Sequence, residues 1–99
     1  MSREKLTPDA IRTQVAELSG WSVAGDKLHR EYQFRDFPQA FGFMTTAALY
    51  IQSMDHHPEW TNVYNRVRVD LSTHDAGGIT ARDVELAKKL EEIAGRFSR

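Results

Sequence analysis

The chain combines two patterns of hydrophobic and polar residues. Hydrophobic residues recur every three or four positions within residues 7–20, 36–55 and 80–93, a spacing typical of amphipathic helices. They recur at every second position within residues 21–34 and 61–73, which is typical of strands. A helix, a strand pair, a helix, one or two further strands and a last helix predict an α+β fold. We expect an antiparallel sheet that is covered by helices on one face.

Each predicted helix begins at a residue type that commonly caps helix N-termini. Thr7 precedes Pro8, and Thr80 precedes the last hydrophobic stripe. Asp36 is followed three residues later by Gln39, which is the spacing of a capping box. The longest helix is expected to bury one hydrophobic stripe, formed by Phe37, Ala40, Phe41, Met44, Ala48 and Ile51. At helical spacing, this stripe indicates core packing rather than a cofactor site.

Both strand-like segments contain turn residues. Gly25-Asp26 divides residues 21–34, so this segment predicts a β-hairpin. Residues 61–73 form either one long strand or two strands joined near Tyr64-Asn65, because asparagine tolerates a left-handed turn. Alternation leaves both possibilities open. In either case, the alternation predicts that one face carries the side chains of Val63, Val67, Val69 and Leu71.

The composition is that of a single ordinary domain, residues 1–99. Thirteen Lys and Arg against fourteen Asp and Glu give a net charge of -1, which argues against nucleic acid or a membrane surface as a partner. The chain has no cysteine, which excludes disulfides and thiolate metal sites. No hydrophobic run approaches the ~20 residues of a membrane span, and no secretory leader is evident. We expect a cytoplasmic protein whose sheet edges favour self-association.

Two neighbouring histidines, His56 and His57, lie where the longest predicted helix ends. Pro58 cannot continue a helix, and it disfavours the helical conformation of the residue before it. Histidine is the side chain that changes charge closest to neutral pH, so the pair is suited to holding and passing protons. The alternative is that both histidines are polar residues of a connecting loop.

A third histidine and a carboxylate are expected near this pair. If residues 61–73 form a hairpin, its two ends meet and bring His74 close to His56 and His57. Asp83 can join them, although an acid in the first turn of a helix also complements the helix dipole. Such a cluster suits acid–base chemistry or a metal ion. We favour acid–base chemistry, because neighbouring histidines point apart and the spacing matches no familiar zinc motif.

Together, His56-His57-Pro58, Tyr64, His74 and Asp83 resemble the signature of the pterin-4a-carbinolamine dehydratases. The same family includes the dimerisation cofactor of a homeodomain transcription factor. The resemblance covers most of the chain, in residues 20–21, 36–37, 40–45, 55–60, 62–65 and 71–74.

The resemblance implies a four-stranded antiparallel sheet with three helices packed on one face, assembled as a homodimer or homotetramer. It implies dehydration of 4a-hydroxytetrahydrobiopterin to quinonoid dihydropterin and water, in tetrahydrobiopterin recycling, without a metal or other cofactor. The family's catalytic residues correspond to His56, His57, His74 and Asp83. Its substrate-binding residues correspond to Asp55, Trp60, Ser72, Thr73 and Asp75. By itself, Trp60 also fits a core aromatic residue.

One position departs from the family pattern. The residue four before the first histidine is ionisable in the family and is Gln52 here. Because four residues are about one helical turn, we expect the amide of Gln52 to reach His56. An alternative function is a non-catalytic dimerisation, assembly or coactivator module on the same fold. Retention of the histidines and of Asp83 favours the enzyme.

Overall fold

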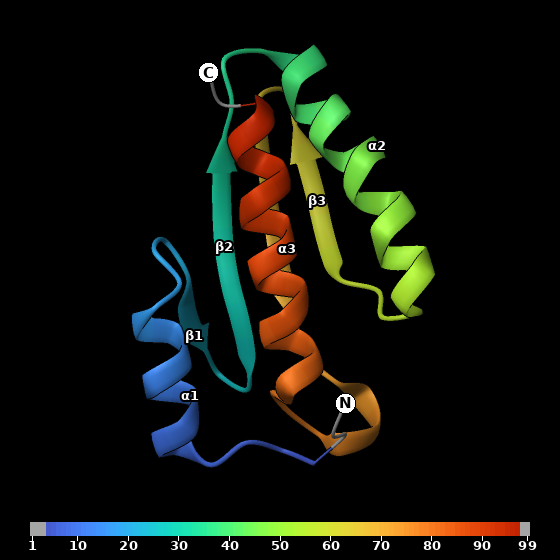
Figure 1. Cartoon of the computed structure of the whole chain (residues 1–99). Helices are drawn as coiled ribbons and strands as arrows, with labels where there is room; N and C mark the ends of the chain where they lie inside the picture. Colours follow the sequence, from blue (N-terminus) through green and yellow to red (C-terminus); the bar gives the residue numbers. More distant parts are fainter. Residues whose placement is uncertain (1–3, 98–99) are drawn as a thin grey trace.

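A computed structural model describes residues 4–97 as a four-stranded antiparallel sheet with three helices on one face (Figure 1). The predicted α+β fold is thereby confirmed. In chain order the elements are α1 (Pro8–Ala16), β1 (Ser22–Ala24), β2 (Lys27–Gln33), α2 (Phe37–Met54), β3 (Glu59–Val63), β4 (Arg66–Leu71), the short 3-10 helix η1 (His74–Ala76) and α3 (Ala81–Phe97). Figure 1 shows α3 running in front of the sheet, between α1 and α2. Among residues 4–97, no helix is both long and apolar enough to cross a membrane.

The strands lie in the order β1-β2-β4-β3, and each neighbouring pair is antiparallel. Of the two possibilities for residues 61–73, a pair of strands joined at Tyr64-Asn65 is correct. Tyr64 adopts a left-handed conformation with a φ of 53°. The side-chain amide of Asn62 secures this turn by donating to the carbonyl oxygens of Tyr64 and Arg66 at 3.0 and 2.8 Å.

The turn changes the face on which Val63 lies. The chain reverses between the two strands, so Val63 pairs with Arg66 and does not continue the alternation of β4. Val63 is 65% exposed, whereas Val67 is fully buried. The predicted common face of these two valines is therefore wrong, although the prediction holds for the buried residues Val67, Val69 and Leu71.

The helix α2 buries only part of the predicted stripe. Its buried residues are Ala40, Phe43, Ala47 and Ile51. The stripe also contained Phe37, Phe41 and Ala48, and these are exposed. Hydrophobic residues occur around most of this helix, so periodicity alone does not select the face. The strands β2 and β4, the residue after β2 and the helix α3 complete the core with Leu28, Tyr32, Phe34, Val67, Val69, Leu71, Leu86, Ala87, Leu90 and Ile93.

The first two helices begin at their predicted caps. The side chains of Thr7 and Asp36 each accept a hydrogen bond from the backbone N–H three residues later, at 3.1 and 2.9 Å. The Gln39 side chain accepts from the N–H of Arg35 rather than from that of Asp36. At the other end of α2, Asp55 is left-handed, with a φ of 50°. The chain therefore leaves this helix sharply, just before the two histidines.

One carboxylate of α3 fastens the helix to the sheet. Oε1 of Glu91 accepts hydrogen bonds from Nε1 of Trp21, Nε of Arg30 and the hydroxyl of Tyr32, at 2.7, 2.9 and 2.8 Å. Burial, and then the bond to Glu91, raise the pKa of Tyr32 above its ordinary value of 10.0. We call these four residues the Glu91 cluster. It holds α3 across β2 and thereby helps to place the N-terminal end of α3.

Candidate active site

The segments that carry the predicted site residues meet at one end of the β3–β4 hairpin. Glu59, in the first position of β3, pairs with Asp70 near the end of β4. Residues 55–58 and 72–75 flank these two positions and therefore lie at the same end. This is the arrangement expected for a hairpin over residues 61–73.

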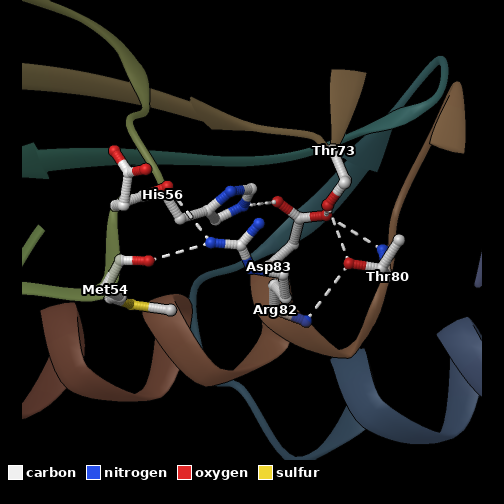
Figure 2. Close-up of polar contacts among 7 residues, drawn as sticks. Met54, His56, Thr73, Thr80, Arg82 and Asp83 are labelled. Carbon is white, nitrogen blue, oxygen red and sulfur yellow. Dashed lines mark hydrogen bonds and ion pairs between the residues drawn. The ribbon is translucent and has the colours of Figure 1, made fainter. Parts of the chain in front are cut away.

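His56 and Asp83 form a buried pair at this end of the sheet. His56 is 7% exposed, and Asp83 is fully buried. Nε2 of His56 lies 2.6 Å from Oδ1 of Asp83 (Figure 2). An ionised carboxylate only accepts hydrogen bonds, so it selects Nε2 as a protonated ring nitrogen. The second ring nitrogen, Nδ1, is left for proton exchange with another group.

The second carboxylate oxygen of Asp83 anchors the pair to the start of α3 (Figure 2). Oδ2 accepts from the hydroxyl of Thr73 and from the backbone N–H of Thr80, both at 2.9 Å. Oγ1 of Thr80 accepts from the N–H of Arg82 at 3.2 Å, so Thr80 caps α3 as predicted. Asp83 therefore acts both as a helix N-terminal acid and as the partner of His56, and the helix dipole favours its negative charge.

Arg82 links the start of α3 to the end of α2. Its guanidinium donates to the carbonyl oxygens of Met54 and Asp55, at 2.9 and 3.1 Å (Figure 2). These carbonyls immediately precede His56, so the contact holds the histidine segment against Asp83. The sequence analysis missed this residue. The available signal was a cation in the first turn of a helix, where it opposes the helix dipole and needs another partner.

His57 contacts the last turn of α2. Its side chain is 56% exposed, and its Nε2 lies 3.0 Å from Oε1 of Gln52. The expectation that Gln52 reaches His56 is therefore wrong. The left-handed Asp55 ends the helix, so His56 does not follow Gln52 by one regular turn, and the chain folds back to bring His57 to the amide. The two neighbouring histidines have different partners.

The remaining predicted residues lie at the same end of the hairpin with unequal exposure. His74 and Asp75 are exposed in η1, and Ser72 is half-buried. Within residues 4–97, the side chain of His74 forms no hydrogen bond or ion pair. Trp60 is half-buried against the core, and with Pro58 it helps to line a hollow of about 410 Å³. The structure thus links His56, Thr73 and Asp83 directly and leaves His74 open to solvent.

This arrangement is suited to proton transfer. His56 and His57 each have Nε2 held by an acceptor, and Nδ1 of His57 also lies 3.9 Å from Oδ1 of Asp55. Within residues 4–97, no group of three or more His, Asp or Glu side chains is placed to hold a metal ion. Paired and exposed imidazoles at one end of a sheet can supply one proton donor and one proton acceptor near neutral pH.

Known relatives share this chain along most of its length. A relative from Solibacter usitatus is 59% identical over 90 residues, which are 91% of this chain and 95% of that protein. A relative from Afipia carboxidovorans is 58% identical over 94 residues, 93% of this chain and 94% of the other. The names of both place them among the pterin-4-alpha-carbinolamine dehydratases.

Two solved structures have folds similar to that of this chain. The crystal structure of a transcriptional coactivator/pterin dehydratase from Brucella melitensis has a TM-score of 0.90 and 46% identity, over 93% of this chain and 100% of that one. A pterin dehydratase-like RuBisCO assembly factor of the alpha-carboxysome has a TM-score of 0.64 over 76% of this chain. At 17% identity, it shares the fold alone. Residues 4–93 match the family described as pterin 4 alpha carbinolamine dehydratase, and the chain belongs to that family.

Proposed function

We propose that the protein is a cytoplasmic dehydratase that converts 4a-hydroxytetrahydrobiopterin into quinonoid dihydropterin and water, in the recycling of tetrahydrobiopterin. The observation that carries the proposal is the buried His56–Asp83 pair, 2.6 Å apart, at the same end of the β3–β4 hairpin as the exposed His74. Membership of the family supports a pterin as the substrate. The reaction needs one proton donor and one proton acceptor, which two histidines can supply.

The proposed reaction breaks the C4a–O bond of the substrate. Protonation of the departing oxygen turns it into water. Removal of the proton on N5 releases an electron pair, which forms the C4a=N5 double bond of the product. No oxidant or reductant is consumed. A general acid and a general base each typically contribute about 10²- to 10⁴-fold to such a rate.

We assign the general acid to His56 and the general base to His74. The carboxylate of Asp83 accepts from Nε2 of His56 and holds the ring in place, so Asp83 is a positioning residue. His74 is exposed in η1, where a substrate can reach it. His57 is held by Gln52 and is assigned to orient the pterin. The proposed pterin contacts are Asp55, Trp60, Ser72, Thr73 and Asp75.

Stopped-flow dehydration of enzymatically generated 4a-hydroxytetrahydropterin tests this proposal. His56→Gln keeps a donor beside Asp83, and His74→Ala removes an exposed ring, so both variants are expected to fold. Each is expected to lower the rate about tenfold or more. His57→Ala is expected to raise the apparent KM as well. The control is His29→Gln, because His29 lies on the sheet face away from the helices. Parent-like rates in both His56→Gln and His74→Ala would overturn the acid–base assignment.

We also propose that the chain forms a homodimer or homotetramer. Three large hydrophobic side chains of α2 are exposed, namely Phe37, Phe41 and Leu49, the last at 74%. Exposed hydrophobic groups of this kind commonly mark an interaction surface. Light scattering is expected to give a mass at least twice the 11.3 kDa of the chain. Leu49→Gln is expected to weaken the assembly, whereas Val23→Thr, an exposed control on β1, is not. A monomer at micromolar concentration would contradict the proposal.

The second candidate is a non-catalytic interaction module. The same exposed residues of α2 favour it, because they present a surface that pterin chemistry does not use. The stopped-flow assay separates the two functions. An interaction module would leave the spontaneous dehydration rate unchanged at any protein concentration, whereas an enzyme accelerates it in proportion to the protein added.

A further inference from the structure

Two arginines of β4 differ from the other arginines of the described chain. Within residues 4–97, five arginine side chains have acceptors, and these are Arg12 with Asp9, Arg30 with Glu91, Arg35 with Asp36, Arg96 with Glu92, and Arg82 with two backbone carbonyls. Within the same residues, the guanidinium groups of Arg66 and Arg68 form no hydrogen bond or ion pair. Two cations without a partner are an unusual feature of a well-paired surface.

Both arginines lie on the sheet face that the helices leave open. They alternate with the buried Val67 and Val69, so their side chains share the other face. Residues two apart on a strand are separated by about 6.6 Å, so the two guanidinium groups are close enough to act on one ligand. Arg66 lies opposite Gln33 of β2, and Arg68 lies opposite Thr61 of β3.

A hollow of about 510 Å³ contains both arginines, together with Gln33, Thr61 and Glu31. Its volume falls within the range of about 300–1,000 Å³ that is typical of small-molecule sites. Two guanidinium charges against the one carboxylate of Glu31 leave it with a net charge of +1. The hollow is therefore positive, although the whole chain carries -1.

The neighbouring charges on this face are already paired. Nδ1 of His29 lies 2.7 Å from Oδ1 of Asp70, and Nζ of Lys27 lies 2.5 Å from Oε1 of Glu59. These pairs tie β2 to β4 and β3. Glu31 lies opposite Arg68 and offsets one of the two arginine charges, which leaves one positive charge in excess in the hollow. Like charges side by side cost free energy, and a bound anion would remove that cost.

We propose that this hollow binds a small molecule through an oxyanion group, a phosphate or a carboxylate. The planar fork of a guanidinium matches the oxygen atoms of such groups, and charge-assisted hydrogen bonds are the stronger ones. The hydroxyl of Thr61 and the amide of Gln33 add neutral donors on either side. Only two arginines contribute, so the site suits one anionic group rather than a polyanion. The proposal is independent of the dehydratase reaction.

A titration of the full-length, ¹⁵N-labelled protein with inorganic phosphate tests the proposal. Amide signals of residues 31–33, 61 and 66–68 are expected to shift in a saturable manner, and chloride at the same ionic strength is expected to leave them in place. Acetate is the carboxylate probe. Arg66→Gln and Arg68→Gln are each expected to weaken phosphate binding about tenfold, the usual effect of losing a hydrogen bond to a charged group.

Two further variants distinguish a specific anion site from nonspecific electrostatic attraction of anions. Arg96→Gln makes the same charge change on α3 and is expected to leave the affinity unchanged. Glu31→Gln removes the opposing carboxylate and is expected to strengthen binding. An equal loss in Arg96→Gln, or binding that never saturates, would indicate an adventitious ion only. A fall in molecular mass of the Arg66→Gln/Arg68→Gln double variant would instead assign the hollow to carboxylates of a second copy, and would equally overturn the proposal.

Discussion

Two carboxylates of α3 are surrounded by donors in similar numbers but balance their charge in different ways. Asp83, in the first turn, accepts from His56, Thr73 and a backbone N–H. Glu91, about two turns later, accepts from three side chains, including the guanidinium of Arg30. Arginine stays protonated at any pH at which the protein is folded, whereas histidine gains and loses its proton near neutrality.

The difference separates a structural carboxylate from the one that is proposed to serve the reaction. The Glu91 cluster contains a guanidinium, a group that does not exchange its proton in a reaction, so this cluster serves to hold α3 on the sheet. The Asp83–His56 pair contains an imidazole, a group that can donate or accept a proton in a reaction. Exposure to solvent does not identify the proposed reactive site, because the His56–Asp83 pair is more deeply buried than the Arg30–Glu91 pair.

Asp83→Asn and Glu91→Gln give the largest predicted contrast. We expect Asp83→Asn to lower the dehydration rate about 100-fold or more, because Nε2 of His56 loses the charged acceptor that holds the ring in place. We expect Glu91→Gln to leave the rate within about threefold and to lower the free energy of unfolding by about 2 kcal/mol, because Arg30 loses its counter-charge. Stopped-flow kinetics and urea denaturation of the same samples measure both effects. Equal rate losses in the two variants would remove the distinction.

Removing the partner of each carboxylate is the next test. His56→Ala leaves Oδ1 of the fully buried Asp83 without its hydrogen-bond partner, and we expect a loss of about 3–5 kcal/mol of unfolding free energy. Arg30→Met is expected to cost less, about 1–2 kcal/mol, because Arg30 and Glu91 are 24% and 30% exposed and water can replace part of the interaction. Chemical denaturation at pH 7 compares the two. A larger loss for Arg30→Met would contradict the order of burial.

A pH series sharpens the description of the Glu91 cluster. The pKa of Tyr32 is raised in the folded state, so the protonated phenol stabilises the fold. This contribution is complete below the unfolded pKa of about 10 and is lost progressively as the pH rises above that value. Tyr32→Phe is expected to cost about 1 kcal/mol at pH 8 and to flatten the decline above pH 10. Urea denaturation between pH 8 and 10.5 measures both changes, and an unchanged slope would exclude Tyr32 as its source.

Gln52→Glu introduces a new carboxylate beside His57 and carries the smallest predicted effect. The new charge faces the exposed ring of His57, where water screens it. Because His57 is assigned to orient the pterin, we expect the apparent KM to change by up to about threefold, with no change in the shape of the pH–rate profile or in oligomeric state. Gln14→Glu on α1 is the matched control. A shifted alkaline limb would contradict the assignment and would make His57 the general acid.

Local features of this fold were predictable from sequence. The helix starts at Thr7, Asp36 and Thr80 depend on residues within one turn, and all appear where the sequence places them. The alternation within residues 61–73 likewise identified Val67 and Val69 as core residues. These predictions succeed because backbone hydrogen bonding and side-chain direction are decided by near neighbours.

The errors concern contacts that depend on the tertiary structure. Phe43 rather than Phe41 enters the core, because packing against the sheet selects one face of a helix that is hydrophobic on several. Gln52 binds His57, because a left-handed residue redirects the chain. His56 follows a helix in a connecting segment, yet it is buried, because α3 carries its partner across 27 residues of sequence. Sequence spacing does not contain this information.

The contact of Arg82 with the end of α2 restricts the insertions and deletions that the protein can tolerate. Its two acceptor carbonyls belong to Met54 and Asp55, and their direction depends on where the helix stops. One residue inserted into α2 would rotate that end by about 100°, and both carbonyls would turn away from the guanidinium. The turn at Gly25-Asp26 lies far from this contact along the chain and carries no such constraint. Insertions and deletions should therefore be tolerated in that hairpin turn and excluded from α2.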